Sequence, residues 1–177
     1  MPVIALTGTP GTGKTSASEE LRRRGYVVVD INKHLRDHDL LGEKDEKRDT
    51  FNVDIDSLNI SLEEYRQKDE TVFLDSHLSH CVDSHTIIVF RCHPDVLAKR
   101  LEVRGYNKDK VKENVQAEIL DVILCEAMES DIPVYEVDCS SGSVLDAVDS
   151  VVDIINGKVD GYLPGKTNWT DEVEKWF

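Results

Sequence analysis

The segment from Gly8 to Thr15, Gly-Thr-Pro-Gly-Thr-Gly-Lys-Thr, constrains the fold of this chain more than any other stretch. It matches the phosphate-binding pattern G-x-x-x-x-G-K-[ST] at every fixed position. The pattern requires a strand before it and a helix after it. Residues 3–6 are a short apolar run typical of a buried parallel strand, and residues 14–24 favour a helix that Gly25 ends. We therefore expect a P-loop, whose backbone N–H groups and helix N-terminus bind phosphates.

Composition limits the alternatives. A chain of 177 residues with 40% hydrophobic and 32% charged residues predicts one soluble globular domain spanning residues 1–177. The net charge of −14 argues against direct DNA binding or a broad nucleic-acid surface, although a local RNA or ribonucleoprotein contact stays open. No apolar run is long enough to span a membrane, and Met1-Pro2-Val3 leads into the first strand without a signal peptide. We expect a cytoplasmic protein, or a nuclear one in a eukaryote.

Apolar runs and helical patterns alternate along the rest of the chain, which predicts an α/β fold with a five-stranded parallel sheet flanked by helices. The further strands are expected at 26–30, 71–75, 86–91 and 133–138, and the further helices at 31–41, 58–68, 94–104, 109–129 and 144–155. The helix at 109–129 is expected to bury Val122 and Met128. Asp56 or Ser57 is expected to cap the helix at 58–68. Residues 30–68 form an insertion large enough to close over a second substrate.

Two parts of this insertion are not helical in the sequence pattern. Residues 43–50 are almost all charged and predict a solvated loop, while residues 51–55 alternate apolar and polar side chains as in an extended segment.

At the other end of the chain, the tail at 157–177 holds both tryptophans and is expected to dock on the body.

The strand at 71–75 ends in Asp75, and His77 follows two residues later. In P-loop proteins a carboxylate at this place holds the Mg²⁺ hydration shell or orients a nucleophile, although strands also end in aspartate for structural reasons. We expect His77 to lie near phosphate or water rather than in a zinc site. Lys14 is expected to reach the β and γ phosphates, and the Thr15 hydroxyl to ligate Mg²⁺.

Arg100 and Arg104 fall on one helix face, four residues apart, at the mouth of a short polar connection. Phosphoryl transfer uses such arginines to neutralise charge on the transferring group, whereas the alternative is a solvated basic helix face. Residues 139–143 are mostly small and polar. They are compatible with an adenine pocket or with a simple loop in which Ser143 caps the next helix.

With the P-loop, Asp75-x-His77 and the segment Arg100-Leu-Glu-Val-Arg-Gly-Tyr-Asn107 in this order, the chain resembles the adenylate kinase isoenzyme 6 family. That family includes the human coilin-interacting nuclear ATPase protein and archaeal "putative adenylate kinases". The resemblance covers about residues 3–155. It implies a P-loop nucleoside monophosphate kinase-like fold with an NMP-binding insertion at about 30–53 and a short lid at about 103–113.

The resemblance also implies roles for individual residues. The ATP-binding set is Gly11, Gly13, Lys14, Thr15, Ser16 and Arg104. Ordinary adenylate kinases carry Asp-Gly-Phe-Pro-Arg where this chain has Asp75-Ser76-His77, and this lid has no zinc ligands. For the acceptor, Arg36 is the first candidate and Arg91 the second, and Asn32 and Arg100 complete the substrate-binding set.

The function expected from these residues is reversible transfer of the ATP γ-phosphoryl group to AMP or another nucleoside monophosphate. Lys14, Mg²⁺ and Arg104 would stabilise the transferring group, Asp75 would hold Mg²⁺ through water, and His77 would orient the acceptor or a water molecule. The resemblance implies an alternative, an ATPase that assists small ribosomal subunit assembly and pre-rRNA processing through contact with a ribosomal protein. A kinase for a small non-nucleotide hydroxyl substrate is a third reading.

Overall fold

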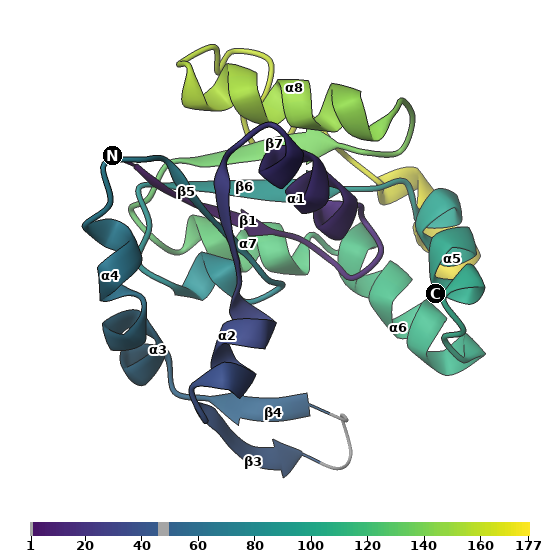
Figure 1. The fold of residues 1–177 in the computed structure, drawn as a ribbon. Helices are drawn as coiled ribbons and strands as arrows, with labels where there is room; N and C mark the ends of the chain where they lie inside the picture. The colour runs from purple at the N-terminus through teal and green to yellow at the C-terminus, as the bar shows by residue number, and fades with distance from the viewer. Residues whose placement is uncertain (1, 46–49) are drawn as a thin grey trace.

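A five-stranded, fully parallel sheet forms the centre of the protein (Figure 1). The computed structural model describes residues 2–45 and 50–177. The strands are β1 (Val3–Thr7), β2 (Val27–Asp30), β5 (Val72–Asp75), β6 (Thr86–Arg91) and β7 (Val134–Asp138). Their order in the sheet is β2-β5-β1-β6-β7. The predicted five-stranded parallel sheet is therefore confirmed, and the strand that precedes the P-loop lies in the middle of it.

Helices cover both faces of the sheet because successive side chains of each strand point to opposite sides. Ile4 and Leu6 of β1 pack under α1 (Lys14–Arg23) and α8 (Val144–Ile155), whereas Ala5 packs toward α7 (Val122–Met128). The start of α8 has the predicted Ser143 cap, in which Ser143 and Asp146 form a reciprocal capping box. This three-layer arrangement fixes the sheet edge at which the strands end.

The insertion between β2 and β5 differs from its predicted form. It contains α2 (Ile31–Asp37), α3 (Ile55–Ser61), α4 (Glu63–Arg66) and a hairpin of β3 (Leu41–Asp45) and β4 (Thr50–Val53). The predicted helix 31–41 ends early, with Asp39 at a positive φ of 54°, so that Leu41 begins a strand. The predicted loop at 43–50 was wrong for residues 43–45 and Thr50, and residues 46–49 lie outside the described part.

The second helix of the insertion was also predicted incorrectly. The helix expected at 58–68 is two short helices, and its cap is Asp54, whose carboxylate accepts the Asp56 amide. The extended segment expected at 51–55 is confirmed as part of β4 for residues 51–53, whereas Ile55 already begins α3.

The predicted helix 109–129 is interrupted. Helix α5 (Pro94–Val103) leads into α6 (Lys108–Ile119), and α7 begins only after Asp121, which adopts a left-handed φ of 55°. Because of this break, Val122 and Met128 are exposed rather than buried, at 37% and 55%. The Arg91 guanidinium bonds the Asp121 carboxylate and the Glu118 carbonyl, which stabilises the break.

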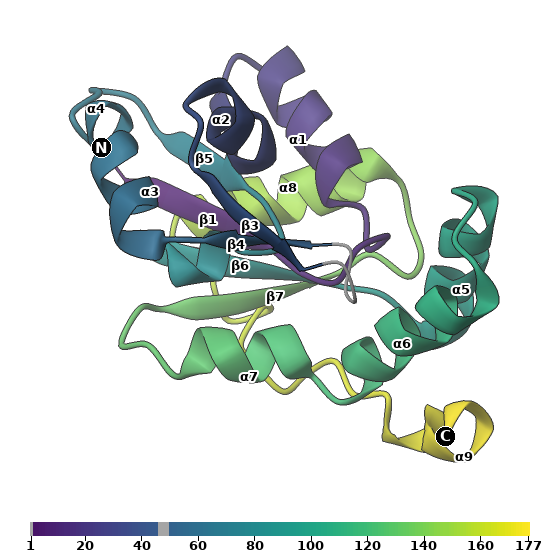
Figure 2. The same ribbon diagram turned by 90° about the horizontal axis from the view of Figure 1, so that it is seen from below.

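The tail after α8 packs on the body, as expected, and ends in the short helices η2 (Thr170–Glu172) and α9 (Val173–Trp176). Figure 2 shows α9 beside α6 and far from α3 and α4 of the insertion. Within the described residues, no helix has the length and apolar character needed to cross a membrane.

Candidate functional site

The P-loop leaves the central strand at its carboxyl end, flanked by the ends of β5 and β6. Gly8 takes a φ of 137°, and an added Cβ there would collide with the Phe90 carbonyl oxygen of β6. The loop therefore crosses the end of the sheet at a distance that only glycine allows. This close approach directs the loop toward α1, whose N-terminus begins at Lys14.

Lys14 lies folded back on the loop. Its ammonium donates to the carbonyl oxygens of Gly8 and, at 3.0 Å, Thr9. The side chain is 8% exposed, and burial lowers its pKa to about 8 although the negative charges of Asp75 and Glu118 act in the opposite direction. A lysine held this way has donors that can turn from the loop carbonyls to a phosphate.

Asp75 ends β5 and lines the same cavity as Lys14 and Thr15. Burial raises the pKa of Asp75, partly offset by the Ser18 hydroxyl and Lys14. A hydroxyl and a carboxylate are the oxygen donors that Mg²⁺ prefers, and a cation between them would relieve the unfavourable burial of the carboxylate. The residues present thus fit a magnesium ion bound with nucleotide. Among the described residues, no cluster of three or more His, Cys, Asp or Glu side chains could hold a metal alone.

His77 lies exposed in the segment after β5 and is one of the residues that line the second cavity. Its pKa is lowered, mainly because the surrounding protein reduces solvation and also because Lys14 is positive. The imidazole is therefore neutral near pH 7, so it can orient a hydroxyl or a water molecule.

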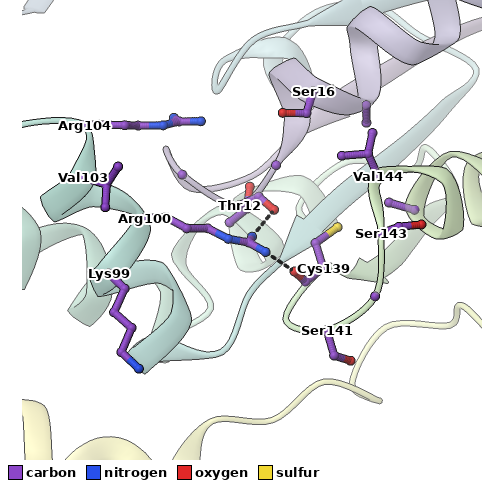
Figure 3. A pocket seen from close by; sticks show the side chains of 15 residues that line it. Thr12, Ser16, Lys99, Arg100, Val103, Arg104, Cys139, Ser141, Ser143 and Val144 are labelled. Atoms are coloured by element: carbon purple, nitrogen blue, oxygen red, sulfur yellow. Dashed lines mark hydrogen bonds between the residues drawn. The ribbon is translucent and has the colours of Figure 1, made fainter.

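A first cavity, of about 490 Å³, lies between the P-loop, the end of α5 and the start of α8 (Figure 3). Arg100 spans it, donating to the Thr12 carbonyl at 3.2 Å and to the Cys139 carbonyl at 2.8 Å. Ser16 and Arg104 also line this cavity, as do the apolar side chains of Val103 and Val144. Arg100 thus lies beside the P-loop, in a different cavity from Arg36.

A second cavity, of about 730 Å³, lies on the other side of the P-loop and shares Gly11, Gly13 and Arg104 with the first. A third, of about 270 Å³, lies under the β3–β4 hairpin and is lined by Arg36 and apolar side chains of α2 and the hairpin. Asn32 and His77 line both the second and the third cavity. The three cavities therefore follow one another across the sheet edge.

The structure brings most of the predicted site residues together. Those lining the second cavity are Gly11, Gly13, Lys14, Thr15, Asn32, Asp75, His77 and Arg104. Ser16 and Arg100 line the first cavity and Arg36 the third, whereas Arg91 must be corrected as an acceptor candidate. It is 1% exposed and pairs with Glu118, Asp121 and Glu136, and it lines none of the three cavities. Burial alone would lower its pKa, but these carboxylates raise it above the ordinary value.

Sequence reasoning missed several polar residues of the second cavity. Asp30, at the end of β2, lies beside Asp75 in register, and Tyr106, Lys110 and Asn114 reach the cavity from α6 and the connection before it. Asp30 ends an apolar strand as Asp75 does, which was a usable signal. Nothing in the spacing of the α6 residues indicates which of them face the cavity.

Comparison with known proteins gives the evolutionary relationship. A protein-family model described as "AAA domain" matches residues 4–121. A protein named "Putative adenylate kinase" from Methanocaldococcus jannaschii is 43% identical over 175 residues, covering 98% of this chain and 94% of the relative. Another of that name, from Archaeoglobus fulgidus, is 39% identical and covers 97% of this chain and 94% of the relative.

Solved structures of P-loop kinases share the fold at low identity. Shikimate kinase from Acinetobacter baumannii aligns with a TM-score of 0.62 at 13% identity, covering 89% of this chain and 94% of that chain. Deoxyadenosine kinase from M. mycoides aligns with a TM-score of 0.52 at 15% identity, covering 89% of this chain and 100% of that chain. With these folds and the near full-length archaeal relatives, the chain belongs to the family of proteins named "Putative adenylate kinase".

Proposed function

We propose that this protein transfers the γ-phosphoryl group of ATP reversibly to AMP. The observation that carries the proposal is the continuity of the three cavities, because Gly11, Gly13 and Arg104 join the first to the second and Asn32 and His77 join the second to the third. An enzyme that moves a phosphoryl group between two nucleotides needs two base sites with a phosphate channel between them. The family relationship to proteins named as adenylate kinases supports the same activity.

The donor would lie in the first cavity, with its base between Val103 and Val144 and its phosphates on the P-loop. Arg100 maintains this cavity by holding the Thr12 carbonyl, and so links the P-loop to the loop after β7. The acceptor base would occupy the third cavity, against Leu35 and Phe51. In this arrangement residues 30–53 bind the acceptor and residues 103–113 act as the lid.

The transferring group would lie in the second cavity. Lys14 turns from the loop carbonyls to the β and γ phosphates, and Arg104 covers the group from the end of α5. Both cations neutralise charge that develops in the transition state. Thr15 and Asp75 would hold Mg²⁺, directly or through water, and the ion would supply positive charge that neutralises the phosphates. Neutral His77 orients the acceptor phosphate, and the Arg36 guanidinium pairs with the same phosphate.

The test is ADP formation from ATP and Mg²⁺ with and without AMP. The proposal predicts a rate that rises to saturation with AMP, and two ADP formed for each ATP consumed. A rate that is independent of AMP would exclude this function. Parallel assays with CMP, GMP and UMP would measure acceptor preference. Assays with small hydroxyl compounds such as shikimate would test whether the protein is a kinase for a non-nucleotide substrate.

A second candidate is ATP hydrolysis coupled to assembly of the small ribosomal subunit. The observation that favours it is the neutral, accessible His77 between the phosphate cavity and the acceptor cavity, where water could take the acceptor's place. This candidate predicts ADP and phosphate formation without AMP that increases when a small-subunit ribosomal protein is added. Absence of hydrolysis under both conditions would exclude it.

A further inference from the structure

A buried carboxylate that the proposed mechanism does not use lies directly behind the P-loop. Glu118 of α6 is 3% exposed. One oxygen, Oε2, accepts the Thr9 hydroxyl at 2.6 Å. The other, Oε1, accepts three donors: Arg91 Nε at 2.8 Å, the Cys92 amide at 3.1 Å and the Trp169 indole nitrogen at 3.3 Å. A buried carboxylate with donors on both oxygens is fixed in place, because any displacement leaves a charge without a partner.

Thr9 transmits the position of this carboxylate to the catalytic lysine. While its hydroxyl is bonded to Glu118, its carbonyl oxygen accepts Lys14 Nζ at 3.0 Å and the Thr12 hydroxyl at 2.9 Å. Thr9 itself is 3% exposed. The orientation of this peptide group, together with the Gly8 carbonyl, therefore holds the Lys14 ammonium in its position on the loop.

The C-terminal tail is hydrogen-bonded to Glu118 and to the carboxylate that Arg91 links to it. Arg91 joins Glu118 to a second buried carboxylate, Glu136. The tail engages Glu136 twice: the Tyr162 carbonyl accepts the Glu136 amide at 2.8 Å, and the Gly165 amide donates to Glu136 Oε2 at 2.7 Å. The Trp169 indole then reaches Glu118 itself. A continuous hydrogen-bonded path thus runs from the tail to the P-loop.

The end of the tail also contacts α5 and α6, the two helices that the proposed lid connects. The Trp176 carbonyl accepts Gln116 Nε2 of α6 at 2.8 Å, and Lys175 pairs with Asp95 of α5 at 2.5 Å. The position of α9 against this helix pair is visible in Figure 2. These contacts hold the base of the α5–α6 pair, from which Arg100 and Arg104 extend to the nucleotide cavities.

The two tryptophans of the tail differ in one respect that allows a controlled experiment. Both are half-buried and pack in the same apolar cluster with α5 and α6. Only the Trp169 nitrogen bonds Glu118. The Trp176 nitrogen is near the Asp95 carboxylate, but it has no hydrogen-bond partner within the described part of the chain. Replacing either with phenylalanine keeps most of the ring and removes the N–H group.

We propose that the C-terminal tail positions the P-loop for phosphoryl transfer through Trp169, Glu118 and Thr9, with Trp169 and Glu118 as positioning residues. The proposal rests on the proposed function for its readout, which is turnover of ATP. Binding of ATP is spread over many backbone N–H groups of the loop, whereas Lys14 is needed most as charge develops in the transition state. A misplaced Thr9 should therefore lower kcat more than it raises KM for ATP.

The experiment compares full-length wild type with Trp169→Phe, Trp176→Phe, Thr9→Val, Thr9→Ser and the double variant Trp169→Phe/Thr9→Val. Trp169→Phe should lower kcat about five- to tenfold, which corresponds to the net contribution of one typical hydrogen bond, with KM for ATP changed less than about twofold. Trp176→Phe should keep kcat within about twofold. Thr9→Ser, which retains the hydroxyl, should keep more activity than Thr9→Val. All assays are run below the lowest melting temperature of the set.

The double variant decides whether the tryptophan acts through the loop. If Trp169 works by way of Thr9, then Trp169→Phe should have little further effect in the Thr9→Val background. Independent, multiplicative effects would overturn the proposal, as would equal losses for the two tryptophan variants. The rates are measured with AMP and with water as acceptor. If the wild-type rate does not depend on AMP, the proposed function is refuted. The kcat values of Trp169→Phe and Trp176→Phe for ATP hydrolysis would then still test this inference.

Discussion

Lys14 should take up a proton when ATP binds at alkaline pH. In the nucleotide-free protein burial lowers its pKa from 10.5 to about 8, so that at pH 9 about nine-tenths of the molecules carry a neutral Lys14. Phosphate oxygens beside the ammonium favour the charged form and return the pKa to its ordinary value or above. Binding should therefore consume about 0.9 proton at pH 9 and about 0.1 at pH 7.

The same shift sets the sign of two pH dependences. Because the pKa in the free protein lies below that of the complex, affinity for ATP should fall as pH rises through 8, by about tenfold between pH 7 and pH 9. The pKa of Lys14 in the folded protein also lies below its value in an unfolded chain. The buried charge therefore disfavours the folded state by roughly 3 kcal/mol below pH 8. That penalty should decrease between pH 8 and pH 10.5.

Isothermal titration calorimetry in two buffers of different ionisation enthalpy measures the uptake directly, and at pH 9 the ATP phosphates themselves are fully ionised. Lys14→Arg is the matched control, since a guanidinium stays protonated throughout this range and should show almost no uptake. An uptake below about 0.2 proton in wild type at pH 9, or equal uptake in the arginine variant, would show that Lys14 is not the group whose charge the phosphates restore.

Three other substitutions test separate parts of the site. His77→Ala should lower kcat at least about tenfold with Kd for ATP changed less than about threefold, because the imidazole orients the acceptor and not the donor; unchanged kcat would remove it from the mechanism. Arg36→Ala should raise KM for AMP at least about tenfold and leave KM for ATP nearly unchanged, and equal changes in both would refute an acceptor role. Arg91→Met should lower the free energy of unfolding by about 3 to 5 kcal/mol in urea titrations, because it leaves Glu118 and Glu136 buried without their cation. A loss below about 1 kcal/mol would mean that these carboxylates do not depend on it.

The parts of the protein that sequence reasoning predicted correctly depend on local chemistry. The P-loop needs glycines, a lysine and a threonine at fixed spacing, and residues 8–15 provide them. Apolar runs that end at Asp30 and Asp75 form adjacent strands whose carboxyl ends meet at one sheet edge. Ser143 caps α8 because its partner, Asp146, is three residues away.

Tertiary structure decided what depends on distant partners. Arg91 has the sequence context of a strand-end arginine, yet three carboxylates from later in the chain enclose it and keep it out of the proposed acceptor site. The helix predicted over 109–129 breaks at Asp121 because bonding to Arg91 outweighs local helix propensity. In the sequence Glu118 is an ordinary helical glutamate. In the structure its carboxylate accepts hydrogen bonds from Thr9 and Trp169, which are 109 and 51 residues away. The sequence by itself determined the P-loop at which we expect phosphate to bind, because that motif is local. Only the folded chain determined which charged side chains line the cavities beside it, because the ion pairs that bury the others join residues far apart in the sequence.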